Sequence, residues 1–311
     1  MNEAVTLKRK GQIHVVLNQK NESITGNNSE SFFFNEEERE KHYPLEKIEK
    51  EMETLVGMDQ MKKLIKEIYA WLYINQCRQS QGLKVEKQTL HMLFKGNPGT
   101  GKTTVARLLA KLFYEMNVLS KGHLVEAERG DLVGEYIGHT AQKTRELVKK
   151  AMGGILFIDE AYSLARGGEK DFGKEAIDCL VKAMEDQQHD FMLILAGYSR
   201  EMERFLSVNP GLPSRFPIMV SFPDYKVGEL VQISKKMIAE REYVLTEPAE
   251  KKIRQHLQAV KSQQVAFSNG RYVRNLVEKA IRNQSVRLLR EGNHERERLM
   301  TLQEEDFQLA E

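Results

Sequence analysis

The sequence predicts an α/β fold, with a parallel-sheet core followed by an all-helical domain, and two observations support this. Between residues 89 and 222, apolar segments alternate with segments of helical spacing, which is the pattern of a parallel sheet covered by helices on both faces. After Pro223, apolar residues recur only at helical spacing. A chain of 311 residues has room for about two domains. We therefore expect a flexible N-terminal segment at residues 1–43, an α/β domain at 44–223 and a helical domain at 224–311.

The individual elements follow this alternation in order. Before the sheet, helical spacing predicts one helix through Leu45 and Leu55 and another through Leu64 and Tyr73. Apolar runs predict strands at residues 89–95, 123–127, 155–158, 191–196 and 218–222. Helices are expected at residues 105–116, 140–150 and 175–185, and after the last strand at 227–241, 247–260 and 271–290. A last short helix is expected from about Thr301.

The composition points to a cytoplasmic protein without a strongly charged partner. With 47 basic and 45 acidic residues, the net charge of +2 gives no strong attraction to nucleic acid or to a membrane surface. No apolar run approaches the length of a membrane span, and the N-terminus lacks a signal-peptide core. The two cysteines, Cys77 and Cys179, lie outside any metal-ligand spacing, so free thiols in a reducing compartment are expected.

The clearest motif is a phosphate-binding loop at Gly96–Thr103, which matches the pattern G-x-x-x-x-G-K-[ST] (Walker A) at every fixed position. An apolar strand candidate precedes it and an amphipathic helix follows, so backbone N–H groups and a helix N-terminus would face a phosphate chain. We expect Lys102 to reach the β- and γ-phosphates of ATP and Thr103 to hold Mg²⁺ through its hydroxyl. The residues expected to contact the nucleotide here are Gly96, Asn97, Pro98, Gly99, Thr100, Gly101, Lys102, Thr103 and Thr104.

A second motif, Ile155–Glu160, consists of four apolar residues followed by two carboxylates (Walker B). The apolar run places Asp159 and Glu160 at the carboxyl end of a buried strand, where ligands of open α/β sheets bind. Asp159 would position Mg²⁺, directly or through water, and Glu160 would polarise the water that attacks the γ-phosphate. Asp-Glu also ends many ordinary strands, but the phosphate loop upstream favours the catalytic interpretation. The glutamate indicates hydrolysis rather than the phosphate transfer of a small-molecule kinase.

These two motifs, together with Asp131–Thr140, Ile194–Tyr198 and Asn209–Phe216, resemble those of the AAA+ ATPases, in the branch that contains red-type Rubisco activase. The resemblance covers about residues 45–311 and leaves the N-terminal segment outside. It implies a Mg²⁺-dependent ATPase with a P-loop NTPase core and a C-terminal helical lid. It also implies assembly into a homo-hexameric ring. The likeness to a bacterial sporulation member of that branch further implies a role in spore formation.

The resemblance assigns further residues outside the two motifs. Arg215 corresponds to the arginine finger that reaches the γ-phosphate of the neighbouring subunit, and a structural arginine at a loop end is the alternative. Arg271, with Arg274 as the other candidate, corresponds to the second sensor motif on the lid. Gly57 corresponds to the hinge beside the adenine, where a plain turn between two helices is the alternative.

Tyr136 and Ile137 match the aromatic and hydrophobic residues of a central pore loop. Such a loop grips a polypeptide through aromatic area rather than through any one side chain, and a partly buried loop tyrosine is the alternative. Residues 165–173, glycine-rich and charged, suit a second loop that faces the pore. The chain departs from many AAA+ proteins at Gly197–Tyr198, where those carry an Asn or Thr sensor, and we assign no catalytic role to Tyr198.

Together these features predict an ATP-hydrolysing ring that remodels a protein partner through its central pore. The alternative is a nucleic-acid-directed motor or loader. The near-neutral charge, the lack of a recognisable DNA-binding module and the aromatic pore motif argue against it. DNA-stimulated ATP hydrolysis that is lost steeply with salt would revive that alternative. The expected partners are further copies of the chain and a protein client, without membrane insertion.

Overall fold

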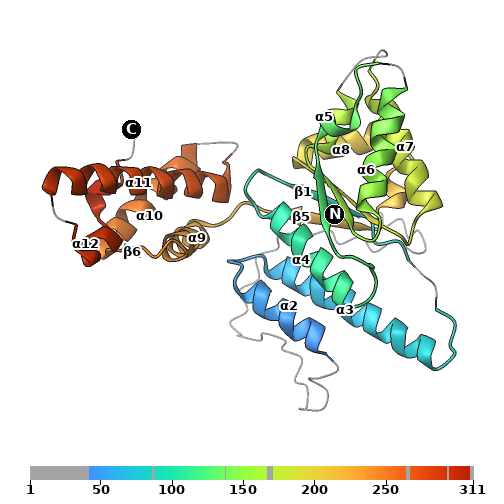
Figure 1. Ribbon diagram of the computed structural model, residues 1–311, viewed down its shortest axis with the longest axis horizontal. Coiled ribbons are helices and arrows are strands. Elements are labelled where there is room, and N and C mark those ends of the chain that lie inside the picture. The colour runs from blue at the N-terminus through green and yellow to red at the C-terminus, as the bar shows by residue number, and fades with distance from the viewer. Residues whose placement is uncertain are drawn as a thin grey trace, which may run out of the picture. The chain divides into compact units, whose positions relative to one another are not determined.

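The computed structural model describes residues 42–85, 88–136, 138–166, 171–263, 267–292 and 294–308 (Figure 1). The chain forms two compact units. The sheet unit contains the described residues up to Lys50, together with Lys63–Lys95 and Thr103–Ser221. The lid unit contains Glu51–Lys62, Gly96–Lys102 and the described residues from Phe222 onward. By its contacts, the phosphate loop therefore groups with the C-terminal helices.

A five-stranded parallel sheet forms the centre of the sheet unit, in the order β2-β3-β4-β1-β5. The strands are β1 (Met92–Gly96), β2 (Leu124–Ala127), β3 (Ile155–Ile158), β4 (Met192–Gly197) and β5 (Ile218–Phe222). β3 is buried at every position, as expected of a central strand covered on both faces. It pairs in parallel with β2 and β4, and Ile158 lies opposite Ala127 and Leu195. The predicted α/β fold class is confirmed.

Amphipathic helices cover this sheet. Their bounds are α2 (Tyr43–Glu53), α3 (Asp59–Ser80), α4 (Lys102–Glu115), α5 (Arg129–Leu132), α6 (His139–Ala151), α7 (Gly173–Asp186) and α8 (Ser199–Val208), with the 3-10 helices η1 (Ala161–Ala165) and η2 (Pro213–Arg215). Leu45, Ile48 and Met52 of α2 are all buried, and this spacing is the one that predicts the helix. α6 and α7 lie side by side (Figure 1).

The lid unit is built on the helices α9 (Val227–Ala239), α10 (Glu247–Gln263), α11 (Asn269–Glu291) and α12 (Arg296–Met300). Two short strands, β6 (Val244–Leu245) and β7 (Thr301–Leu302), pair in parallel, and the 3-10 helix η3 (Glu304–Asp306) follows. Leu257, Phe267, Val273 and Phe307 are among the buried side chains of its core. The helical character of this part of the chain is confirmed.

The prediction of a short helix that begins at about Thr301 is wrong. α12 ends at Met300, Thr301 has the extended dihedral angles φ −100° and ψ 121°, and Thr301–Leu302 is β7. The buried amide of Gln284 donates to the carbonyls of Leu299 and Thr301 at 2.9 and 3.0 Å. These bonds satisfy carbonyl groups that a helix end leaves unpaired, so the chain can turn into the strand at this point.

Two further findings concern the cysteines and the helices. Cys77 and Cys179 are free, partly buried thiols. In the part of the chain that the structure describes, every helix is too short or too polar to cross a membrane.

Candidate nucleotide site

The phosphate loop turns sharply between β1 and α4, and its glycines make the turn possible. Gly99 and Gly101 have φ angles of +69° and +94°, which residues with a side chain rarely adopt. The Thr100 hydroxyl donates to the Asn97 carbonyl at 2.8 Å and closes the loop. Because α4 begins at Lys102, the N–H groups of its first turn follow the loop directly. This is the strand, loop and helix arrangement that the motif requires for phosphate binding.

Lys102 is held inside the loop. Its ammonium donates to the carbonyl oxygens of Gly96 and Asn97, each at 2.8 Å, and the residue is only 9% exposed. The ammonium group is therefore already positioned at the loop, where the phosphates are expected to bind. Thr103, partly buried, and Thr104, exposed, follow in the first turn of α4. The nucleotide contacts assigned to these residues stay predictions.

Three residues from the C-terminal part of the lid unit fasten the phosphate loop, a feature that the sequence analysis missed. The Asn97 amide donates to both carboxylate oxygens of Asp224, at 3.0 and 3.1 Å. Asn269, fully buried with a φ of +46°, donates to the same carboxylate at 2.7 Å. The Gly270 N–H donates to the Gly99 carbonyl at 3.0 Å. We call Asp224, Asn269 and Gly270 the loop clamp.

The loop clamp depends on an asparagine in the left-handed conformation at the start of α11. Asparagine and glycine adopt this conformation at low cost, so Ser268–Asn269–Gly270 is a local sequence signal for it. The side-chain oxygen of Asn269 accepts the Tyr225 N–H at 3.0 Å, and its amide also donates to the Phe267 carbonyl at 2.9 Å. A buried polar network that is paired in this way fixes the backbone around it.

The predicted hinge segment Val56–Gly57–Met58 lies in the same unit as the loop. The Met58 methyl packs against Gly101, where an added Cβ would lie 2.2 Å from the Met58 Cε atom. From another side, the Tyr225 hydroxyl donates to the Thr100 carbonyl at 3.3 Å. Burial, and then the nearby charge of Glu229, raises the pKa of Tyr225 to about 12, so this hydroxyl remains a donor at neutral pH.

The predicted lid arginines begin α11, which lies directly against the loop. A Cβ on Gly99 would lie 2.6 Å from the backbone nitrogen of Arg271, so only glycine allows this approach. The side chains of Arg271 and Arg274 are exposed. Gly57 has a φ of +66°, and a Cβ there would lie 2.5 Å from a carboxylate oxygen of Glu229. The roles of these residues toward the nucleotide stay predictions.

The carboxylate pair at the end of β3 has an unusual backbone. Glu160 has φ 48° and ψ 40°, in the left-handed region that residues with long side chains rarely visit. Its N–H donates to Oδ1 of Asp159 at 2.9 Å, and its carbonyl accepts the Ser163 N–H at 2.8 Å. These bonds fix the backbone, whereas the Glu160 residue as a whole is exposed. Strain of this kind, held in place by its surroundings, is concentrated at functional sites.

The oxygen donors predicted to hold Mg²⁺ are the Thr103 hydroxyl and the Asp159 carboxylate. Both are hard ligands, which suit Mg²⁺. Across the described ranges, no group of three or more His, Cys, Asp or Glu side chains could hold a metal ion. The donor set therefore fits Mg²⁺ held by one or two protein ligands, water and nucleotide phosphates, rather than a metal caged by protein.

Arg215, the predicted arginine finger, ends η2 on the surface of the sheet unit. Its Nε donates to the Glu185 carboxylate at 3.1 Å, its Nη2 pairs with the same oxygen, and its Nη1 donates to the Gly211 carbonyl at 2.6 Å. The side chain keeps 31% of its surface exposed. Since an exposed ion pair contributes little free energy, Arg215 can exchange Glu185 for another anion at low cost.

Tyr136, the predicted pore-loop aromatic, is 66% exposed, so the alternative of a partly buried tyrosine is not what the structure shows. Its ring stands edge-on to His139, with centroids 5.4 Å apart. Ile137 lies outside the described residues. Residues 167–170 of the second predicted loop also lie outside the described residues, whereas the residues on either side of them, including Arg166 and Asp171, are described. Their part in a pore stays a prediction.

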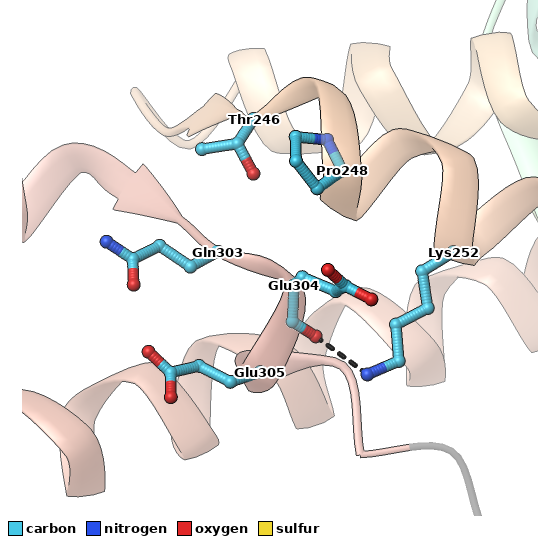
Figure 2. A pocket seen from close by; sticks show the side chains of 6 residues that line it. All are labelled: Thr246, Pro248, Lys252, Gln303, Glu304 and Glu305. Atoms are coloured by element: carbon cyan, nitrogen blue, oxygen red, sulfur yellow. Dashed lines mark hydrogen bonds between the residues drawn. The ribbon is translucent and has the colours of Figure 1, made fainter.

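A hollow on the surface of the lid unit contains none of the predicted site residues (Figure 2). It is lined by Thr246, Pro248, Lys252, Gln303, Glu304 and Glu305. The Lys252 ammonium donates to the backbone carbonyl of Glu304 at 3.0 Å, as Figure 2 shows, and so joins α10 to η3. We interpret this contact as structural.

The fold and the motifs define a class of protein. A phosphate loop between a parallel strand and a helix, a carboxylate pair ending a buried strand, and a C-terminal helical domain define a P-loop nucleoside triphosphatase with a lid. The model of the ATPase family associated with various cellular activities (AAA) matches residues 92–224, and that of the AAA lid domain matches residues 226–311. The chain belongs to the AAA family of ATPases.

Two curated relatives and one solved structure illustrate its neighbours. Stage V sporulation protein K of Bacillus subtilis (strain 168) is 62% identical, over 100% of this chain and 98% of its own. The chloroplastic ribulose bisphosphate carboxylase/oxygenase activase of Cyanidioschyzon merolae (strain NIES-3377 / 10D) is 46% identical, over 81% of this chain and 87% of its own. The crystal structure of the FIGL-1 AAA domain has a TM-score of 0.57 at 17% identity, covering 82% of this chain and 80% of that one, and shows the fold alone.

These findings confirm the resemblance to the branch of red-type Rubisco activase, and with it the enzyme class. The protein is an AAA ATPase related to the sporulation protein and to the activases. Its cofactors are ATP and Mg²⁺.

Proposed function

We propose that the protein is an ATP-driven ring that remodels a protein partner by engaging it in a central pore. The observation that carries the proposal is the 46% identity, over 81% of the chain, to a relative whose name states that it activates another protein. The exposed Tyr136 supports a gripping surface, because an aromatic ring offers a large contact area to any polypeptide. In this proposal residues 44–223 hydrolyse ATP, 224–311 form the lid, and 1–43 lie outside the shared machinery.

The residues of the two motifs divide the hydrolysis between them. Lys102 would neutralise charge on the β- and γ-phosphates, and the hydroxyl of Thr103 and the carboxylate of Asp159 would hold Mg²⁺, which would supply further positive charge to the phosphates. Glu160 polarises the attacking water and accepts its proton. Phosphoryl transfer needs mainly positioning and charge stabilisation, which these groups supply.

Arg215 completes the site of a neighbouring subunit in this proposal. Its ion pair with Glu185 is exposed, so the guanidinium can leave it for a γ-phosphate. A residue that acts across an interface makes activity depend on assembly, and we propose a homo-hexamer. From the lid, Arg271 or Arg274 would sense the same phosphate, and Gly57 would let the backbone approach the adenine.

The client is a protein segment that enters the ring and meets Tyr136 and Ile137. The full-length similarity to a sporulation protein supports a role in spore formation, and we propose that the protein acts in the cytoplasm. Each cycle of ATP hydrolysis would move the pore loop of one subunit relative to the next and so pull on the segment.

A trapped variant tests the proposal. Glu160→Gln should bind ATP and hold the assembled ring, because the phosphate contacts remain while the base is lost. We expect ATP turnover to fall at least about 100-fold and client proteins to co-purify with the ring. Size-exclusion chromatography with light scattering measures the assembly, and mass spectrometry identifies the captured proteins.

The matched control adds a second substitution to the trap. Tyr136→Ala in the Glu160→Gln background should lose the captured clients, whereas Tyr114→Ala, at another exposed tyrosine, should keep them. A trapped form that stays monomeric at saturating ATP contradicts the ring. Clients retained equally by both double variants contradict the role of Tyr136.

A further inference from the structure

A buried tyrosine next to the carboxylate pair has a hydroxyl group without a partner. Tyr162, in η1, is 4% exposed, and its oxygen is shielded from solvent. Among the described residues, no donor or acceptor meets this oxygen at hydrogen-bonding geometry. Native proteins pair nearly all buried polar groups, so an unpaired hydroxyl two residues after Glu160 calls for an explanation.

The ring of Tyr162 is fixed by three neighbours. The Arg166 guanidinium carbon lies 4.5 Å from the ring centroid, at the distance of a cation–π contact. The Tyr198 ring lies 5.6 Å away, centroid to centroid, with the two planes at 33°. On a third side the ring reaches Gly197, where an added Cβ would lie 2.7 Å from the Tyr162 Cδ1 atom. The phenol oxygen is therefore held in one place.

The contact with Gly197 explains the departure at the end of β4. Many AAA+ proteins carry an Asn or Thr sensor there, but any side chain at Gly197 would collide with the Tyr162 ring. The same ring carries the buried hydroxyl that no described residue pairs with. The missing polar side chain and the unpaired hydroxyl are two parts of one arrangement.

The Glu160 carboxylate is close enough to influence this hydroxyl. Burial, followed by the negative charge of Glu160, raises the pKa of Tyr162. The phenol therefore stays protonated at neutral pH and can donate to a carboxylate, which only accepts.

We propose that the Tyr162 hydroxyl donates a hydrogen bond to the Glu160 carboxylate during turnover and orients it toward the attacking water. Tyr162 is thus a positioning residue that acts in place of a sensor side chain at Gly197. One carboxylate oxygen accepts from Tyr162, and the other stays available to the water. Because the Glu160 backbone is fixed, one bond to its carboxylate restricts the directions that the side chain can take. The inference rests on the role given to Glu160 in the proposed function.

The test replaces Tyr162 by phenylalanine, which keeps the ring and its contacts and removes only the oxygen. We expect the kcat of ATP hydrolysis to fall about 10- to 100-fold, as for the loss of a hydrogen bond to a charged group. The KM for ATP and the Tm should change little, because no described residue meets the hydroxyl within the usual distance and angle limits of a hydrogen bond. Combined with Glu160→Gln, the substitution should cause no further loss of kcat, since its target is gone.

Two matched variants remove a phenol oxygen elsewhere. Tyr198→Phe removes it from the neighbouring ring, and Tyr69→Phe removes a buried hydroxyl that lies 2.7 Å from Nδ1 of His42. Both should keep kcat within about twofold, and Tyr69→Phe should lower the Tm because it breaks an existing bond.

Three results would overturn the inference, and they point to different errors. An unchanged kcat for Tyr162→Phe beside an inactive Glu160→Gln shows that Tyr162 does not position the base. A larger loss for Tyr198→Phe moves the role to that residue. Parental turnover in Glu160→Gln removes the proposed base itself, and the inference falls with it.

Discussion

The phosphate loop and the end of β3 carry the two motifs, and the polar side chains of these two regions differ in how completely they are hydrogen-bonded. At the loop, Asn97, Asp224 and Asn269 are joined by hydrogen bonds of 2.7 to 3.1 Å, and Lys102 donates to loop carbonyls. At the end of β3, Glu160 is exposed on a left-handed backbone and the Tyr162 hydroxyl has no partner among the described residues.

This difference suggests that the region for binding nucleotide is preorganised, whereas the region proposed for hydrolysis is not. The loop is organised for phosphates by groups of its own chain, so nucleotide binding requires little rearrangement. The proposed catalytic groups lack such a network, and in the proposed ring a bound nucleotide and a neighbouring subunit would complete their arrangement. In that ring, this division would keep an isolated subunit from hydrolysing ATP.

The largest expected effect tests the proposed hydrolytic groups, which need an arginine from a neighbouring subunit. Arg215→Ala should keep ATP binding and lower hydrolysis about 10³- to 10⁵-fold, as for the loss of an arginine finger. Phosphate release measures turnover, and a fluorescent ATP analogue measures binding. Glu185→Gln is the matched control, because it removes the ion pair of Arg215 and leaves the guanidinium intact. Equal losses in both variants would show that Arg215 is only structural.

A smaller effect tests the phosphate loop and the loop clamp that supports it. Asn269→Ala removes the four hydrogen bonds of this side chain, which join it to Asp224, Tyr225, Phe267 and Pro98. The loss should destabilise the fold by about 2–4 kcal/mol. ATP should bind more weakly because the loop loses its support. Urea unfolding measures the first effect and titration with a fluorescent ATP analogue measures the second. Asn275→Ala, at an exposed asparagine of α11, should change neither. Full ATP affinity in a folded Asn269→Ala variant would contradict the clamp.

The smallest effect concerns a buried histidine at the other end of β1 from the loop. Burial lowers the pKa of His91 to about 4, and its Nδ1 accepts the Leu193 N–H at 3.0 Å. The unfolded chain binds this proton more readily than the folded one, so stability is full above pH 6.5 and is lost as the pH falls toward 4. From pH 7.5 to 5 the loss from His91 is about 2 kcal/mol.

Urea unfolding at the two pH values measures this loss. His91→Gln keeps an acceptor for Leu193 and should flatten the pH dependence by that amount, with turnover at pH 7.5 unchanged. The exposed His294→Gln should not flatten it. An equal pH dependence in all three proteins would contradict the assignment.

The sequence predicts most of the sheet because its signals are local. The apolar run Ile155–Ile158 predicts β3 residue for residue, and the glycine pattern Gly96–Thr103 predicts the strand, loop and helix around it. Turn chemistry and periodicity depend on neighbours within a few positions, so a single sequence carries them. The helix predicted from about Thr301 is wrong for the opposite reason. The extended conformation of Thr301 depends on the pairing of β7 with β6, which is distant in the sequence.

The loop clamp and the contact between Tyr162 and Gly197 lie beyond such signals. Asn97 meets Asp224 from 127 positions away along the chain, and neither residue belongs to a pattern that announces the contact. Gly197 is visible in the sequence as a departure, but its reason is a ring on another element. Long-range pairs of this kind appear only once the fold brings the segments together.

One mixing experiment tests the central claim that the loop is complete within a chain whereas hydrolysis needs a second chain. Arg215→Ala and Glu160→Gln subunits should each be inactive alone. In a mixed ring, an Arg215→Ala subunit beside a Glu160→Gln subunit has its own Glu160 and receives the neighbour's Arg215. Titrating one variant into the other, with co-assembly confirmed by light scattering, should restore ATP hydrolysis. Co-assembled rings that remain inactive at every ratio would contradict the account.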